Sequence, residues 1–258
     1  MTKTPRERAR EQTMAEILSI GRAQLAVHGA AGLSLRAVAR ELGVVSSAVY
    51  RYVKNRDELL TLLLVDGYNA LGDAVDRAVD DAVDEAGHDD FLAQLRALGH
   101  AVREWALAEP ARYGLLFGAP VPGYEAPANE TTAPGTRVVL RLVHLIEGAY
   151  HAGAMEGHMQ GQTVGSATAR KSDPALAQTP SANFAAVRAE LGLEVPDDVL
   201  ARGILVWAAL FGAVNFEVFG QYGATTFADP GALFELHLDS LAKILGLQAA
   251  GTHQRQTF

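Results

Sequence analysis

A short run of side chains between residues 46 and 51 carries the groups in this chain best suited to reading a polar partner. Ser46, Ser47, Tyr50 and Arg51 would share the outer face of a short helix, while Val49 and Val53 face inward. Hydroxyl and guanidinium groups donate hydrogen bonds, and the fork of an arginine can pair with the O6 and N7 atoms of guanine. The pattern therefore favours contact with the edges of DNA bases.

The residues before this run predict a first helix and a tight turn. Leu35, Val38, Ala39 and Leu42 recur at the i, i+3, i+4 and i+7 spacing of one apolar helix face. Gly43 supplies the left-handed residue that ends this helix. Residues 33–60 thus predict a helix, a turn, a second short helix and the start of a third. A helix-turn-helix unit of this kind places its second helix in the DNA major groove.

Within this unit the sequence separates base readers from phosphate contacts. Base contacts are predicted for Ser46, Ser47, Ala48 and Arg51. Phosphate contacts are predicted for Ser34, Arg36, Tyr50, Tyr52, Lys54 and Arg56. Two alternatives stay open: Tyr50 could cap the small core, and Arg36 and Arg40 could pair with Glu41 on a solvated face.

The charge of the chain is unevenly distributed. The formal net charge of the 258 residues is −8, yet residues 1–60 hold ten lysines and arginines against six aspartates and glutamates. A basic head on an acidic body keeps phosphate affinity in one place. Residues 1–10 carry Lys3, Arg6, Arg8 and Arg10 and predict a mobile basic arm, which either contacts phosphates or is a solvated terminus.

Composition limits the compartment and the kinds of site. The chain has no cysteine, which excludes disulfides and cysteine-based zinc sites and suits the cytoplasm. No N-terminal apolar stretch resembles a signal peptide. The longest apolar run, around residues 204–214, is expected to be too short to span a bilayer. We therefore expect a soluble, cytoplasmic protein that does not contact a membrane.

Apolar periodicity predicts an all-α fold. Helices are predicted at about 8–28, 56–86, 89–109, 111–117, 137–155, 183–191, 197–221 and 230–247, in addition to the two short ones above, with loops at 119–136 and 156–182. Ser34 is the predicted N-cap of the helix that contains Leu35, and Asn55 with Glu58 predicts a box-like cap for the helix that follows. The helix over 56–86 is long enough to join the head mechanically to the acidic body.

The last two predicted helices are apolar on more than one face. A helix that is apolar all round must be buried on all sides, which in a chain of this size suggests a partner subunit. We expect a homodimer through about residues 197–247. The alternative is a thick core within one chain.

The stretch GVVSSAVYRYVKNRDELL, preceded by LSLRAVAREL, resembles the DNA-binding head of TetR-family transcriptional regulators over about residues 10–63. Tyr52 stands where the family commonly has histidine, and Val49 where it often has leucine. The segments 105–118 and 207–220 resemble a C-terminal type marked by a Trp-x-x-x-His-Gly pattern, with Phe211 in place of the histidine.

This resemblance implies a three-helix helix-turn-helix head (1–55, with the basic arm) on a larger helical ligand-binding and dimerisation domain (56–258). It also implies a homodimer that binds a palindromic operator, usually as a repressor, and that is released by an unknown small-molecule effector. A DNA-binding dimer without an effector is an alternative. A helical enzyme is a third reading, but no glycine-rich phosphate loop, HExxH motif or nucleophile elbow supports it.

Effector pockets are concave and mostly apolar, with a few polar groups. The predicted pocket residues are Trp105, Tyr113, Phe117, Tyr150, Met155, Trp207, Phe211 and Asn215, with ordinary core packing as the alternative for each. Asn215 is the most informative, because an amide within an apolar helix needs a partner. His144, Glu147 and His151 have a spacing that could hold a metal, but they lie opposite the apolar face of their helix. Neither a metal nor a cofactor is therefore predicted.

Overall fold

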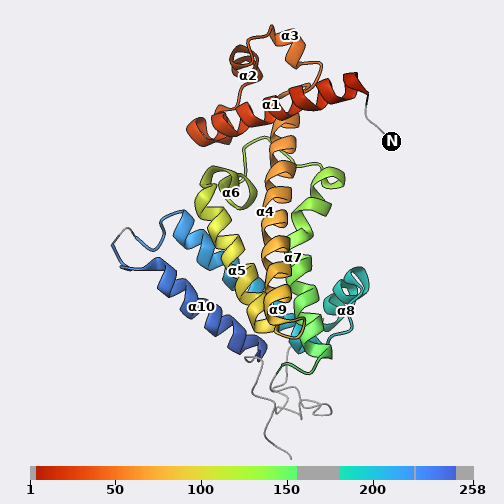
Figure 1. Ribbon diagram of the computed structural model, residues 1–258, viewed down its shortest axis with the longest axis vertical. Helices are drawn as coiled ribbons and strands as arrows, with labels where there is room; N and C mark the ends of the chain where they lie inside the picture. Colours follow the sequence, from red (N-terminus) through yellow and green to blue (C-terminus); the bar gives the residue numbers. More distant parts are fainter. Residues whose placement is uncertain (1–3, 156–179, 224, 248–258) are drawn as a thin grey trace, which may run out of the picture. The chain divides into compact units, whose positions relative to one another are not determined.

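The computed structural model describes residues 4–155, 180–223 and 225–247, and this part of the chain is helical (Figure 1). Its elements are α1 (Pro5–His28), the 3₁₀-helix η1 (Ala30–Gly32), α2 (Leu35–Glu41), α3 (Ser46–Val49), α4 (Arg56–Ala86), α5 (Phe91–Ala108), α6 (Pro110–Phe117), α7 (Ala128–His151), α8 (Pro180–Leu191), α9 (Asp197–Val218) and α10 (Pro230–Leu245). Extended pairing within the described ranges is limited to one isolated bridge between Met155 and Leu247. The predicted all-α class is confirmed.

The chain forms two compact units. Unit 1 consists of Met1–Ala74 and Val102–Val138, and unit 2 of Val75–Ala101 and Val139–Phe258. Helices α4, α5 and α7 each contribute residues to both units. The predicted boundary after Asn55 lies inside unit 1. The predicted boundary divides the chain by function, whereas the two units are defined by packing alone. The boundary therefore stays a prediction.

Helices α1 to α4 of unit 1 enclose a small apolar core near the N-terminal end of α4 (Figure 1). Its buried members are Ile17, Leu25, Leu33, Leu35, Val38, Ala39, Val49, Val53, Leu59, Leu60 and Leu63. Gly43 has a φ of 69°, as predicted for the residue that ends α2. Ser34 caps α2 through a hydrogen bond from the Ala37 amide (3.4 Å), so this prediction is also confirmed.

The predicted mobile arm is wrong from residue 5 onward, because α1 begins at Pro5. The Thr4 hydroxyl accepts a hydrogen bond from the Glu7 amide (3.2 Å), and the Glu7 carboxylate accepts one from the Thr4 amide (2.8 Å). These two bonds form a capping box, and Pro5 occupies a position where its missing N–H costs nothing. Hydrogen bonds from Thr4 also lower the pKa of the Glu7 carboxyl.

The predicted loop 119–136 is wrong for its second half, because α7 begins at Ala128 and contains Pro134. A proline in a helix removes one backbone hydrogen bond. Packing within unit 1 offsets this loss: a Cβ at Gly135 would already touch the Tyr68 ring at 3.4 Å, and Arg137 donates to Asp73 at 2.8 Å. Tertiary contacts therefore start the helix nine residues before the predicted Arg137.

The part of this segment that remains a loop, residues 119–127, is anchored to α4. The Tyr124 hydroxyl lies 2.9 Å from the hydroxyl of buried Thr61, and burial raises the pKa of Tyr124. Residues 156–179 of the other predicted loop, 156–182, lie outside the described residues. The last three residues of that loop belong to α8, which begins at Pro180.

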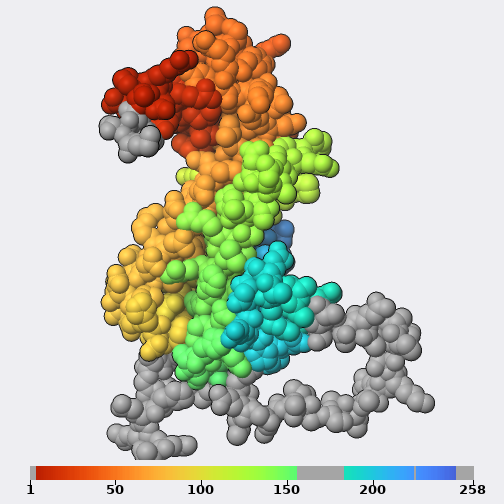
Figure 2. All heavy atoms as spheres, turned by 90° about the vertical axis from the view of Figure 1, so that its right-hand side faces the viewer, coloured from red at the N-terminus to blue at the C-terminus, as the bar shows by residue number. Residues whose placement is uncertain are grey.

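Unit 2 is built around the packing of α9 against α10. Gly99 of α5 allows a close approach, because a Cβ there would lie 2.5 Å from a methyl carbon of Leu238. On another side, α8 lies against the end of α7 (Figure 2), and the Glu194 amide after α8 donates to the Glu147 carboxylate at 2.8 Å. Ion pairs from Arg96 of α5 to Glu235 (2.9 Å) and Asp239 join α5 to α10.

The apolar run around residues 204–214 was expected to be too short to span a bilayer. By length and composition this is wrong for the helix that contains the run. Helix α9 has 22 residues and is long and apolar enough to cross a membrane, although the same holds for core helices of soluble proteins. Only 28% of its most apolar window is buried within the protomer. The exposed remainder therefore needs something to cover it.

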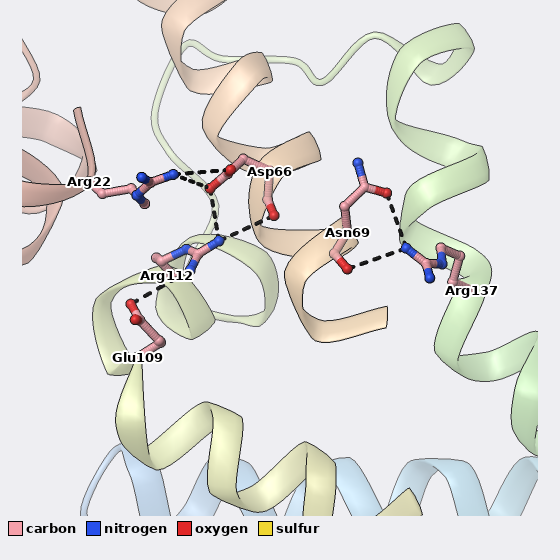
Figure 3. A network of polar contacts seen from close by, with 6 residues as sticks. All are labelled: Arg22, Asp66, Asn69, Glu109, Arg112 and Arg137. Carbon is pink, nitrogen blue, oxygen red and sulfur yellow. Dashed lines mark hydrogen bonds and ion pairs between the residues drawn. The ribbon is translucent and has the colours of Figure 1, made fainter. Parts of the chain in front are cut away.

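A carboxylate on α4 joins three helices of unit 1 (Figure 3). Asp66 accepts a hydrogen bond from Arg22 of α1 (3.1 Å) and one from Arg112 of α6 (2.8 Å). Arg112 also donates to the Asp66 carbonyl (3.2 Å), and its guanidinium lies 5.3 Å from the centre of the Trp105 ring. Because the Arg112 side chain is only 12% exposed, Asp66 is its main compensating charge.

Replacing Asp66 by asparagine should lower the free energy of unfolding by about 1–3 kcal/mol, because a nearly buried guanidinium would lose its charged partner. Asp73→Asn is the matched control: Asp73 pairs with Arg137 but is 61% exposed. That change should cost less than about 1 kcal/mol. Urea denaturation of the two variants measures the difference, and equal losses would contradict the special role of Asp66.

Candidate nucleic-acid interface

Two buried valines hold α3 and the turn after it in place against the core of the head. Helix α3 has only four residues, and its Val49 and the following Val53 are 1% and 0% exposed. A helix this short is not stable without packing. The predicted inward orientation of both valines is confirmed, and it fixes which side of α3 faces out.

The outward side chains carry most of the predicted reading groups. Ser47, Tyr50, Arg51 and Lys54 are exposed, and Ser46 is half-buried. Tyr50 is 45% exposed, so it does not cap the core as the alternative supposed. Within the described ranges, no hydrogen bond or ion pair occupies the Arg51 guanidinium. Ala48, the remaining predicted base contact, is half-buried on α3.

Three predicted phosphate contacts are already engaged by the protein. The Ser34 hydroxyl caps α2, and the Arg56 guanidinium donates to the Ala30 carbonyl at 2.9 Å. Tyr52 is half-buried against the head core, with the Arg10 guanidinium 5.4 Å from its ring centre. These groups retain free donors, so their phosphate contacts stay predictions. Arg10 joins this surface from α1, although sequence reasoning placed it in a mobile arm.

Gln24 positions α2, a role that the sequence did not predict. Gln24 is 4% exposed; its amide group donates to the Glu41 carboxylate (3.1 Å) and its oxygen accepts from the Ser34 amide (3.3 Å). Glu41 is therefore held by Gln24, and the described residues show no ion pair from Arg36 or Arg40 to it. The available signal was position: Gln24 is seven residues after buried Ile17, on the apolar face of α1.

The predicted effector-pocket residues divide between the two units. Trp105, Tyr113 and Phe117 belong to unit 1, and Tyr150, Met155, Trp207, Phe211 and Asn215 belong to unit 2. Tyr113 is fully buried, its ring centre lies 5.0 Å from that of Phe117, and burial raises its pKa. In unit 2, the side-chain oxygen of Asn215 is buried and accepts no hydrogen bond from any described residue.

Two of the hollows that described residues line belong to unit 2. One is apolar, holds about 40 Å³, and lies between α7, the segment after α8, and α9; Trp207 is the predicted pocket residue that lines it. The other holds about 290 Å³ and is more polar, with Asp80, His88, Gln94, Arg141 and His144 in its wall. No cluster of three potential metal ligands occurs within the described residues. Glu147 of the metal-like trio instead accepts the Glu194 amide.

Comparison with known proteins matches both parts of the chain. Residues 17–63 match the family model of bacterial regulatory proteins of the tetR family, and residues 95–241 match that of the tetracyclin repressor-like C-terminal domain. HTH-type transcriptional regulators of Mycobacterium tuberculosis and Mycobacterium bovis are 47% identical over 240 residues. These matches cover 93% of this chain and 95% of each relative.

Solved structures share the fold. Regulatory protein SCO4313 superposes with a TM-score of 0.67 at 32% identity, covering 93% of this chain and 100% of that one. A tetR-family regulatory protein from Rhodococcus RHA1 superposes with a TM-score of 0.56 at 14% identity, covering 91% and 97%, which shows a shared fold alone.

The roles of Arg51 and Lys54 can be separated on DNA. Arg51→Ala should weaken binding to the preferred site by about 1–3 kcal/mol and binding to random DNA much less, because the contact predicted for Arg51 is to a base. Lys54→Ala should weaken binding to both DNAs and reduce the salt dependence by about one ion, because the contact predicted for Lys54 is to a phosphate. Fluorescence anisotropy at several salt concentrations measures both effects. Equal losses for Arg51→Ala on the two DNAs would assign it to the backbone.

Proposed function

This chain belongs to the TetR family of DNA-binding transcriptional regulators, and from that premise we propose that it is a cytoplasmic repressor that binds a palindromic operator as a homodimer. The relatives are regulators and not enzymes, as the sequence predicted. The observation that carries the proposal is the outward side of α3 and of the turn that follows it, where Ser47 of α3 and Tyr50 and Arg51 of the turn are exposed.

The dimer is supported by the exposed apolar face of α9. Ile204, Leu205, Trp207, Phe216 and Phe219 are each between 42% and 52% exposed, and Leu236 of α10 is 63% exposed. Large apolar patches on a soluble protein mark interaction sites. A second copy of the chain covers such a face symmetrically, so each copy buries the same residues. Two copies then present two α3 helices, and the operator must repeat about one helical turn, or a multiple, apart.

An effector that releases the DNA fits less well into the apolar hollow, which at about 40 Å³ is far below the usual 300–1,000 Å³ of ligand pockets. The polar hollow of about 290 Å³ is close to that range. It is the proposed region for a small polar effector, and its wall contains none of the eight predicted pocket residues. Those eight residues stay a separate prediction. The small size of the apolar hollow favours, as a second candidate, a DNA-binding dimer that needs no effector.

Selection of bound sequences from a random duplex pool tests the DNA-binding proposal. We expect enrichment of a palindrome with half-sites about one turn apart, because two symmetry-related α3 helices read it. Affinity for the selected site should fall steeply with salt, as phosphate contacts require. A pool that shows no enrichment over non-specific binding would contradict the proposal.

Gly212 tests the dimer without disturbing the protomer. It lies on α9 in line with Leu205, Ala208, Phe216 and Phe219, and a Cβ built there meets no atom within 4 Å. Gly212→Leu should therefore stabilise the helix by up to about 1 kcal/mol. It should weaken self-association about fivefold or more, because extra bulk in a packed contact costs about 1–3 kcal/mol.

Sedimentation equilibrium measures this dimer constant. Ala189→Leu, on an exposed position of α8, is the matched control and should leave the constant unchanged. Unaltered self-association of Gly212→Leu, or a wild-type chain that is monomeric at micromolar concentration, would rule out the proposed interface.

A further inference from the structure

Helix α3 begins differently from the other helices of the head. Thr4, Ser34 and Asn55 each accept a hydrogen bond from a backbone amide of the helix they precede, at 3.2, 3.4 and 2.8 Å. Val45 occupies the N-cap position before α3, and no side chain caps this helix. Valine is among the poorest N-cap residues, since it offers no oxygen to the free amides of the first turn. Helix stability therefore does not explain Val45.

Packing does not explain Val45 either. Its side chain is 72% exposed, whereas Val38, Val49 and Val53 of the same head are at most 1% exposed. A single exposed valine is ordinary on a protein surface, and Val27 of α1 is similarly exposed at 74%. Val45 differs from Val27 in its place: it occupies a position where a polar residue would add stability, directly before Ser46 and Ser47. Residues that break a local rule in this way concentrate at functional sites.

The partner that fits an exposed aliphatic group at this position is a thymine. The first residues of a recognition helix approach the base edges in the major groove. Thymine presents its C5-methyl group there, and apolar side chains read it by contact. Cytosine presents no methyl group but an N4 amino donor, which valine cannot accept. We propose that Val45 selects thymine in each operator half-site through its C5-methyl group. This inference rests on the proposed function, since it requires an operator.

The test replaces thymines of the selected site, one position at a time, by deoxyuridine. Deoxyuridine keeps the base pair and the O4 acceptor and removes only the methyl group. For the wild-type chain, one thymine position in each half-site should lose about fourfold in affinity, which corresponds to one methyl group returned to water. Anisotropy titration at fixed salt concentration measures the loss.

Variants of Val45 assign this loss to the side chain. Val45→Ala should bind the thymine and deoxyuridine sites with equal affinity at that position. Val45→Ser should do the same while raising the thermal midpoint of unfolding, because serine supplies the missing cap. If Val45 does not contact the thymine methyl group, Val45→Ser should gain the same stability but keep the preference for thymine over deoxyuridine. Val27→Ala is the matched control and should keep the fourfold ratio.

The outcomes separate this inference from the proposed function. A wild-type chain that selects no site would refute the proposed function itself. A selected site at which no thymine responds to deoxyuridine would refute the inference alone. A thymine that responds equally in the wild type and in Val45→Ala would also refute it, since another side chain would then read the methyl group.

Discussion

Burial of two valines is the constraint on which the reading surface depends. Helix α3 has four residues and no side-chain cap, so neither propensity nor hydrogen bonding forms it alone. Val49 and Val53 pack into a core assembled from α1, α2 and α4. Their position inside this core determines the orientation of Ser47, Tyr50 and Arg51 outside it. A change that loosens the core would therefore alter DNA recognition without touching any reading residue.

Polar residues give this small apolar core its fixed geometry. Hydrophobic burial has no direction, whereas Gln24 binds both the Ser34 amide and the Glu41 carboxylate, at the two ends of α2. Asp66 likewise joins α1 and α6, because it accepts hydrogen bonds from Arg22 and from Arg112. Each residue is largely shielded from water, so each fixes a helix position at the cost of desolvating a polar group. The head is thus oriented by a few directional contacts around a non-directional core.

The local features of the fold followed from the sequence, and the long-range ones did not. The bounds of α4, the Ser34 cap and the inward valines were predictable, because spacing and cap chemistry are local. The Thr4–Glu7 capping box was equally readable, yet the basic charge of the segment suggested a mobile arm. The start of α7 around Pro134 depends on Tyr68 and Arg137, and the Asp66 contacts join residues 44 and 46 positions apart. No local pattern encodes such partners.

The exposed face of α9 has a consequence for how the regulator responds to its own abundance. If each copy contacts half of an operator, a single chain binds the operator weakly, and the dimer is the species that binds it. Below the dimer dissociation constant, the concentration of pairs rises with the square of the concentration of chains. A twofold change in synthesis then gives about a fourfold change in operator-binding protein. The apolar surface of α9 would in this way make operator occupancy rise more steeply with protein concentration than it does for a regulator that binds DNA as a monomer.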